Sequence, residues 1–341
     1  MEIRRPAPLR PGDTIGVTAP SSGVPADLRP RLDHAVALLR RRGFEVALGA
    51  CLDGSGIVSA PAAERAAELT AMLADPAVRA VVPPWGGELA IDLVGLVDWD
   101  ALRDATPTWF VGYSDCCSVS MPLLTRAGWA GVHGANLMDT PYDAPAGLAH
   151  WLDVVTAEGP LVQRAHGRHR SSGFDDWTAD PTASTWRLDA AGDWRVVNAP
   201  ADGVDVSGLL VGGCVEVLGP LAGTPYGDVE GFGRAHADEG LVVLLEVAED
   251  GALDVARALH GMRLAGWFAH ARAVVVGRTA APDAPGLTQH EAVLDTLGGL
   301  GVPLLLDVEV GHVPPQMPLV LGAPTRLVAD AARREIHQSP R

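Results

Sequence analysis

Residues 109–124, WFVGYSDCCSVSMPLL, run from an apolar segment through a short polar turn into a segment of small side chains. The apolar residues predict a strand that ends at Val111, and a helix is expected to begin after the turn at 112–115. Within five positions the stretch offers four hydroxyl or thiol groups that could act as nucleophiles, on Ser114, Cys116, Cys117 and Ser118.

The spacing of small residues favours Ser114 among these four. A nucleophile held on a sharp strand-to-helix turn needs small residues two positions before and after it, because the two backbones approach closely there. Gly112 and Cys116 provide them around Ser114 and around no other candidate. Ser114 would then lie at a helix N-terminus, whose dipole stabilises a developing anion. A serine that only caps the helix is the alternative, and the spacing leaves both open.

The first 150 residues or so alternate between strand and helix patterns. Strands are expected at 15–20, 44–48, 79–85 and 108–112, and helices at 27–44, 59–73 and 88–97. This βαβ series predicts an α/β fold with a mostly parallel sheet and helices on both of its faces. The site of such a sheet lies at the carboxyl ends of its strands, which is where Ser114 falls.

The rest of the chain divides into a connector and a second domain. Residues 166–205 are polar and irregular and carry the aromatic residues Phe174, Trp177, Trp186 and Trp194. Strand and helix patterns return from about Val206 onward. We therefore expect an N-terminal domain with the nucleophile at 1–165, an aromatic connector at 166–205, and a smaller C-terminal α/β domain at 206–341.

The composition excludes several classes of function. The chain has 341 residues and a formal net charge of −16, which argues against a nucleic-acid polymer or an anionic membrane as partner, because both need a basic surface. It contains no lysine, which removes Ser–Lys dyads, Schiff bases and the P-loop lysine. The four cysteines form no CxxC pair and no zinc spacing. We expect a reduced, cytoplasmic protein that needs no metal and no organic cofactor.

A catalytic serine needs a base, and histidine is the natural one in a chain without lysine. His312 follows a strand pattern and precedes two prolines that would stiffen its loop, whereas His133 follows a short apolar run near the first-domain site. The base in turn needs an orienting carboxylate. Glu246 ends the run LVVLLE, and Glu249 is the solvated alternative three residues on. The residues by themselves leave both choices open.

Six short motifs occur in order along the chain: WGGE at 85–88, GYSD at 112–115, HGAN at 133–136, GG at 212–213, LLE at 244–246 and GHVPP at 311–315. No single motif is specific, but the ordered set resembles the serine peptidase family of murein LD-carboxypeptidases and the microcin C immunity hydrolase. The opening LRPGDTIGVTAPSSG and the late PLVLGAPTRL also resemble it, so the likeness spans nearly the whole chain.

The resemblance implies a triad in which Ser114 is the nucleophile, His312 the general base and Glu246 its orienter. It also implies an oxyanion hole formed by the backbone N–H groups of Gly87 and Asp115, and members of the family are commonly homodimers. The residues expected against a small peptide or aminoacyl-nucleotide substrate are Trp85, Gly86, Glu88, His133, Trp177 and Trp186.

Two departures from the family pattern bear on the substrate. Cys214 stands where the family often has asparagine after the GG, and PPWGGELA replaces the GGYGS-like stretch of murein-type members. The aromatic connector resembles the loop that covers the nucleotide end of the substrate in the immunity branch. Its tryptophans could stack on a base, or they could only pin a long loop to the protein body.

We therefore expect hydrolysis of an amide bond near the C-terminus of a small peptide or aminoacyl-nucleotide conjugate, as in antibiotic self-immunity. A murein tetrapeptide cleaved in wall recycling is the alternative substrate. Two hypotheses from other classes also stand. A binding protein that kept only the fold would bind ligand without turnover, and an amidotransferase-like enzyme that uses Cys116 would be inactivated by thiol alkylation.

Overall fold

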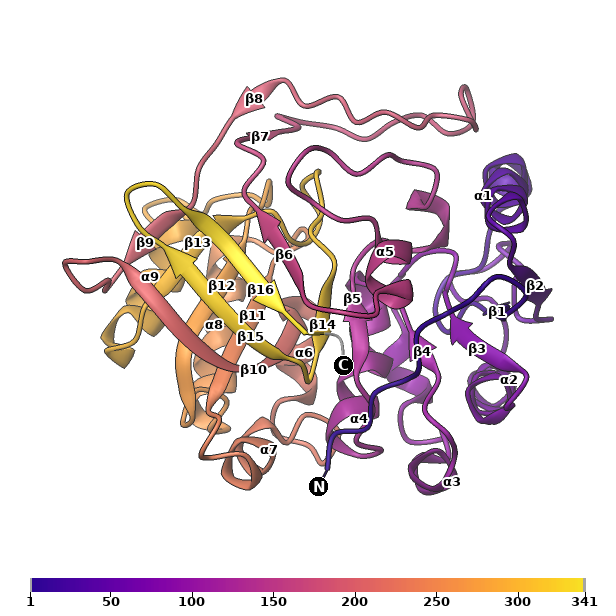
Figure 1. Cartoon of the computed structure of the whole chain (residues 1–341), viewed down its shortest axis with the longest axis horizontal. Coiled ribbons are helices and arrows are strands. Elements are labelled where there is room, and N and C mark those ends of the chain that lie inside the picture. Colours follow the sequence, from indigo (N-terminus) through magenta and orange to yellow (C-terminus); the bar gives the residue numbers. More distant parts are fainter. Residues whose placement is uncertain (1, 340–341) are drawn as a thin grey trace.

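A parallel sheet of four strands forms the centre of the N-terminal half of the computed structural model, which describes residues 2–339 (Figure 1). The strand order is β2-β1-β3-β4. The strands are β1 (Thr14–Val17), β2 (Glu45–Leu48), β3 (Val78–Val81) and β4 (Trp109–Phe110). The predicted α/β fold with a parallel N-terminal sheet is confirmed.

Helices cover both faces of this sheet, as the βαβ pattern predicts. The N-terminal helices are α1 (Arg29–Arg41), α2 (Ala62–Ala74), α3 (Trp99–Asp104), α4 (Cys117–Thr125) and α5 (Trp151–Thr156). Buried side chains of α1 and α5 share one apolar cluster with the sheet. Those of α2, α3 and α4 share a second cluster. The sheet therefore separates two apolar layers.

The helix predicted at 88–97 is wrong. The segment holds one 3-10 turn, η2 (Ala90–Leu93), followed by irregular backbone. The backbone N–H of Ala90 donates to the Asp115 carboxylate at 2.7 Å, so a tertiary contact holds the start of this segment. Gly95 adds a residue with poor helix propensity. The spacing of apolar residues alone therefore predicted a longer and more regular helix than the segment forms.

Eight strands of the described chain form a mixed sheet in the C-terminal half, in the order β6-β16-β15-β10-β11-β12-β13-β9 (Figure 1). The four strands β10 to β13 run parallel at its centre. The strands are β6 (Leu161–Arg164), β9 (Arg195–Val197), β10 (Val204–Cys214), β11 (Leu241–Glu246), β12 (Ala271–Gly277), β13 (Leu304–Val308), β15 (Pro324–Ala329) and β16 (Arg334–Gln338). The helices of this half are α6 (Val215–Leu221), α7 (Val229–Ala235), α8 (Ala252–Leu264) and α9 (Gln289–Leu297).

Two elements tie the halves together. Strand β14 (Leu319–Leu321) belongs to the C-terminal part of the sequence, yet it pairs antiparallel with β5 (Gly131–His133) of the N-terminal part. Helix α4 is buried from Cys117 through Leu124. Some of its side chains belong to the C-terminal core and others to the N-terminal cluster. An all-round buried helix explains why its sequence is apolar on every face.

The connector expected at 166–205 is only partly irregular. It contains a short pair of strands, β7 (Arg168–His169) and β8 (Ala190–Ala191), and then β9 at the edge of the C-terminal sheet. Its segment with β7 and β8 passes above both halves in the view of Figure 1. The C-terminal sheet thus takes β9 from the connector and β6 from before it.

The turn at the start of α4 is as sharp as the sequence predicts. Strand β4 ends at Phe110, and Ser114 begins a 3-10 turn, η3 (Ser114–Cys116), that leads directly into α4. Ser114 has a φ of +63°, in the left-handed region that residues with a side chain rarely adopt. A Cβ on Gly112 would lie 2.9 Å from that of Cys116. The small residues on both sides of Ser114 are therefore required by backbone contact.

Because the backbone at Ser114 is left-handed, we expect glycine to be more stabilising than alanine at this position, the reverse of the usual order in a helix. Since this conformation disfavours residues with a Cβ by about 1–2 kcal/mol, Ser114→Gly should have a free energy of unfolding about 1 kcal/mol larger than that of Ser114→Ala. Urea denaturation of the two variants measures the difference. Ser118 inside α4 is the control, because Ser118→Gly should be about 1 kcal/mol less stable than Ser118→Ala. Equal stabilities of the two Ser114 variants would contradict the strained turn.

Candidate active site

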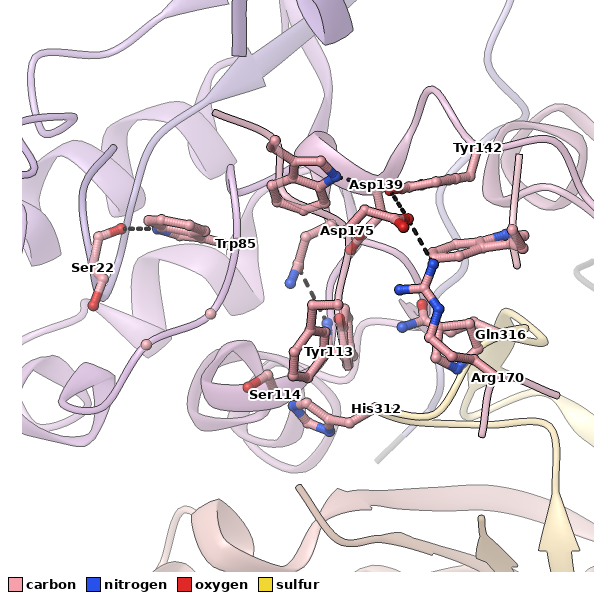
Figure 2. Close-up of a pocket in the computed structure, with 17 residues that line it drawn as sticks. Ser22, Trp85, Tyr113, Ser114, Asp139, Tyr142, Arg170, Asp175, His312 and Gln316 are labelled. Carbon is pink, nitrogen blue, oxygen red and sulfur yellow. Dashed lines mark hydrogen bonds and ion pairs between the residues drawn. The ribbon is translucent and has the colours of Figure 1, made fainter. Parts of the chain in front are cut away.

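Ser114 and His312 line one cavity of 410 Å³, which Figure 2 shows. The two residues come from different halves of the chain, since His312 lies in the loop between β13 and β14. The cavity is lined by Ser22, Trp85, Gly86, Gly87, Tyr113, Ser114, Asn136, Asp139, Tyr142, Arg170, Phe174, Asp175, Trp177, Trp186, His312, Pro314 and Gln316. The predicted nucleophile and base are therefore brought together where a ligand could reach them.

Glu246 lies behind His312. All six residues of β11 are buried, and the strand delivers Glu246 at its carboxyl end. The Nδ1 atom of His312 lies 2.7 Å from Oε2 of Glu246. Since an ionised carboxylate only accepts hydrogen bonds, Nδ1 carries the proton and Nε2 is left free to accept one. The Ser114 hydroxyl makes no hydrogen bond among the described residues, and in ligand-free enzymes such contacts often tighten only when substrate binds.

Glycines allow this carboxylate to be packed closely. A Cβ on Gly311 would lie 2.5 Å from Oε2 of Glu246, and one on Gly277 would lie 2.9 Å from its Cβ. Gly311 also has a φ of +90°, which favours glycine. The close approach of this loop to Glu246 thus explains why Gly311 precedes His312 in the motif GHVPP.

The charges of Glu246 and His312 stabilise each other. Burial alone would raise the pKa of Glu246, but His312 lowers the pKa below its ordinary value. Burial alone would lower the pKa of His312, but Glu246 raises the pKa above its ordinary value. The pair therefore favours a carboxylate that orients a basic imidazole, which is the arrangement used to activate a serine.

The alternatives left open by the sequence occupy other places. Glu249 is exposed, and its N–H donates to Glu216. His133 is buried and lines neither of the two cavities that meet Ser114. Its Nε2 atom lies 4.0 Å from Oε1 of Glu246, the carboxylate oxygen that does not bond His312. The structure therefore places His133 away from the substrate position expected for it.

The cysteines near Ser114 lack the environment of a nucleophilic thiol. Cys116 and Cys117 are fully buried, and burial raises the pKa of both thiols well above its ordinary value. A thiol that stays protonated is a weak nucleophile. Neither cysteine lines the cavity of Ser114. These observations argue against an enzyme that depends on Cys116.

The loop that carries Gly86 and Gly87 lies directly against the nucleophile. A Cβ on Gly86 would lie 2.7 Å from that of Ser114 and 3.0 Å from the backbone nitrogen of Asp115. Gly87 has a φ of +140°. The Asp115 carboxylate accepts from the Ser21 hydroxyl at 2.5 Å, which ties this turn to the loop after β1. The predicted oxyanion donors, Gly87 and Asp115, thus flank Ser114.

Aromatic rings form one wall of the cavity (Figure 2). The ring of Trp186 stacks on that of Tyr142 with centroids 3.7 Å apart, and the Trp177 indole N–H donates to the Tyr142 hydroxyl at 2.8 Å. The Arg31 guanidinium lies 4.9 Å from the Tyr142 ring. Arg170 pairs with Asp175 at 2.7 Å, although its own side chain is only 4% exposed. We call the rings of Tyr142, Trp177 and Trp186 the aromatic wall.

The connector tryptophans divide between the two roles considered for them. Trp177 and Trp186 line the cavity, whereas Trp194 is buried in the C-terminal core and donates to Glu309 at 2.6 Å. Phe174 is 83% exposed and lines both cavities that meet Ser114. The connector therefore anchors itself through Trp194 and presents other aromatic rings to the site.

A second cavity, of 780 Å³, opens on the other side of Ser114 and His312. Glu88, which was expected at the substrate, lines this cavity, whereas Trp85 and Gly86 line the first. Glu216 and Glu249 line the second cavity as well, and no arginine does so among the described residues. We call it the acidic cavity.

Several lining residues were not foreseen from the sequence. Tyr142, Arg170 and Gln316 line the first cavity, but they lie in irregular segments where no periodic pattern singles them out. Asn136 also lines the cavity, and its Oδ1 accepts the Tyr113 N–H at 3.3 Å. Asn136 ends the motif HGAN, so that motif was the one available signal.

Within residues 2–339 no group of three or more His, Cys, Asp or Glu side chains is arranged to hold a metal ion. Over the same residues, none of the helices combines the length and the apolar character that crossing a membrane requires.

Comparison with known proteins identifies the family. Residues 15–134 match the model of the LD-carboxypeptidase N-terminal domain, and residues 207–327 match that of the C-terminal domain. A protein of Streptomyces coelicolor, named as a candidate carboxypeptidase, is 30% identical over 333 residues, covering 96% of this chain and 94% of that protein. The microcin C7 self-immunity protein of Escherichia coli is 22% identical over 326 residues, which are 93% and 90% of the two chains.

The fold agrees with that of solved structures. The microcin C7 self-immunity protein in complex with aspartyl sulfamoyl adenosine superposes with a TM-score of 0.81 at 20% identity over 98% of both chains. The MccF-like protein of Bacillus anthracis gives 0.78 at 21% identity, again over 98% of both chains. With its two matched domains and a relative at 30% identity over nearly its full length, the chain belongs to the LD-carboxypeptidase family.

Proposed function

We propose that this protein is a serine hydrolase that cleaves an amide bond in an aminoacyl-nucleotide conjugate or a similar small peptide conjugate. The observation that carries the proposal is the buried Glu246–His312 pair, at 2.7 Å, which shares a cavity with a serine on a strained turn. A protein that only binds a ligand has no use for a buried carboxylate that orients a histidine beside a strained serine.

In the proposed mechanism His312 takes the proton of the Ser114 hydroxyl as the Ser114 oxygen attacks the acyl carbon. The backbone N–H groups of Gly87 and Asp115 hold the tetrahedral oxyanion, and losing one such donor typically lowers the rate by about 10²–10³. His312 then gives the proton to the leaving nitrogen, and water hydrolyses the acyl-enzyme in the same way. Glu246 keeps the imidazole in the required tautomer and stabilises its charged form.

The aromatic wall supports a nucleotide-like leaving group. A flat base could stack on exposed aromatic faces, and each such stack contributes about 1–3 kcal/mol without reading a sequence. Arg170 is buried beside these rings and pairs with Asp175, and its Nε atom has no hydrogen-bond partner among the described residues. The self-immunity relative has been solved with aspartyl sulfamoyl adenosine and with glutamyl sulfamoyl guanosine, and both ligands have this chemistry.

The alternative substrate is a murein tetrapeptide that ends in D-alanine. A Bacillus subtilis relative, 25% identical over 324 residues, is named as a probable murein peptide carboxypeptidase. The acidic cavity is the observation that favours this alternative, because its carboxylates suit the amino groups of a wall peptide.

A turnover assay with two substrates side by side tests both the reaction and the substrate. Purified protein should release the nucleotide product from an aminoacyl sulfamoyl-adenosine, and Ser114→Ala should lower the rate by at least about 10³. Mass spectrometry follows both products. Ser120→Ala, which changes a buried serine of α4 that lines neither cavity, is the control and should remain active. Unchanged hydrolysis by Ser114→Ala would refute the proposed triad. Release of D-alanine alone would favour the alternative function in wall recycling.

The acidic cavity predicts a charge preference on the acyl side of the bond. Because like charges in a confined site repel, a lysyl sulfamoyl-adenosine should be cleaved with a kcat/KM about tenfold higher than its aspartyl analogue, a difference of about 1.4 kcal/mol. Because both conjugates have the same leaving group, the ratio of their kcat/KM values reports only on the acyl side of the bond. Glu249→Gln should narrow the ratio, because it removes one exposed carboxylate of this cavity. A preference for the aspartyl conjugate would contradict this assignment of the cavity.

A further inference from the structure

The carboxylate of Glu246 has a second oxygen that the proposed mechanism does not use. Oε2 accepts from His312, but Oε1 is buried and has no hydrogen-bond partner among the described residues. The Nε2 atom of His133, 4.0 Å away, is also buried and also lacks a partner. Buried polar atoms in native proteins are nearly always paired. The two unpaired atoms face each other on the side of Glu246 away from the cavity.

The hydrogen bonds around His133 allow one consistent arrangement of protons. The Cys214 N–H donates to Sγ of Cys117 at 3.4 Å. Burial raises the pKa of Cys117, so its thiol keeps a hydrogen, and this can be donated to Nδ1 of His133 at 3.7 Å. A neutral imidazole that accepts at Nδ1 carries its hydrogen on Nε2, where it points toward Glu246. Burial lowers the pKa of His133, which favours this neutral form.

The backbone holds His133 in place. It ends β5, where it pairs with Leu319 of β14 at the junction of the two halves. Gly311 and Gly277 crowd Glu246 from other sides. The distance of 4.0 Å exceeds a normal hydrogen bond, so a rotation or shift of about 1 Å is needed to bring the two atoms to bonding distance. His133 is therefore placed to control the one free oxygen of the carboxylate.

We propose that His133 is a positioning residue of the triad, whose Nε2–H holds Oε1 of Glu246 and thereby fixes the carboxylate against His312. The proposal rests on the proposed function, because it assumes that His312 is the base. By engaging Oε1, His133 also limits how strongly the carboxylate attracts a proton to His312. His133 thus contributes to the reaction through Glu246, without contact with the substrate.

The other groups around this pair stay constant when His133 is changed. The ring of Tyr113 meets His133 edge-on at 6.4 Å and lies 4.9 Å from the ring of His312. The carboxylates of Glu216 and Asp139 also act on the charge of His312. The Cys214 thiol acts on Glu246 as well. His133 and His312 interact directly only when both are charged, so a shift in the basicity of His312 on changing a neutral His133 would come through Glu246.

The experiment uses a fluorophosphonate, which labels an activated serine without knowledge of the natural substrate. Labelling rates of Ser114 are measured from about pH 5 to about pH 9 for the wild type, His133→Asn and His133→Gln. Glutamine can place an amide N–H near the position of Nε2, whereas asparagine is too short to do so. The Asn variant should be labelled about tenfold more slowly, and the Gln variant should regain most of the rate.

The pH dependence of the labelling rate distinguishes a positioning role of His133 from a role in packing alone. Without the Nε2–H the carboxylate keeps its full charge for His312, which raises the pKa of His312. Since a base with a higher pKa stays protonated up to a higher pH, the acid limb of the Asn variant should move upward, and the Gln variant should restore it. His290→Leu, which removes a histidine paired with Asp307 at 3.0 Å outside the site, should change neither the rate nor the limb.

The contrary outcomes are distinct. An Asn variant with the rate and limb of the wild type would overturn the proposal. So would slow labelling of both variants with an unshifted or lowered limb, because that result means lost packing alone. Melting temperatures report folding, and His133→Leu gives a second variant without the donor. Labelling of Ser114→Ala at the wild-type rate would instead refute the proposed function, whatever the His133 variants show.

Discussion

The burial of one carboxylate is the constraint on which the rest of the site depends. Glu246 is fully buried, and removing an ion from water costs several kcal/mol unless partners compensate. The partners come from segments far apart in sequence, with His312 after β13 and His133 at the end of β5. His312 belongs to the same half as Glu246, whereas Ser114 and His133 come from the other half. Docking of the two halves therefore brings the proposed nucleophile to the Glu246–His312 pair.

Helix α4 explains why Ser114 is the proposed nucleophile among the four candidates of this stretch. The helix is packed between the cores of both halves, so Cys116, Cys117 and Ser118 are buried, and the chain needs small residues there for space. Ser114 stands one turn earlier, where the backbone adopts a left-handed conformation and turns the residue into a cavity. Strain at this residue is compatible with function because the surrounding packing enforces it.

Regular elements could be predicted where a local pattern determines them. The helix expected at 27–44 corresponds to α1 (Arg29–Arg41), and the parallel strands follow apolar runs. The segment 88–97 failed because its first N–H groups bind Ser21 and Asp115, a tertiary contact that periodicity cannot show. His133 was expected at the substrate for a related reason: the sequence locates a strand end but does not show which side the side chain faces. Trp177 and Trp186 of the aromatic wall were expected at the substrate from the family resemblance, whereas Tyr142 lies in an irregular segment where periodicity gives no signal.

The two cavities that share Ser114 differ in charge, which gives the reaction a direction. Arg170 lines the first cavity together with Asp139 and Asp175, whereas the other cavity is lined by four acidic residues and, among the described residues, by no arginine. In a chain with a net charge of −16, an arginine at one end of a site is informative, because the overall negative field otherwise disfavours an electron-rich ligand group there. A substrate with an electron-rich leaving group and an amine-bearing acyl group would bind in one orientation only. Charge would then set which bond faces Ser114, while the proposed roles of Glu246 and His312 concern the chemistry itself.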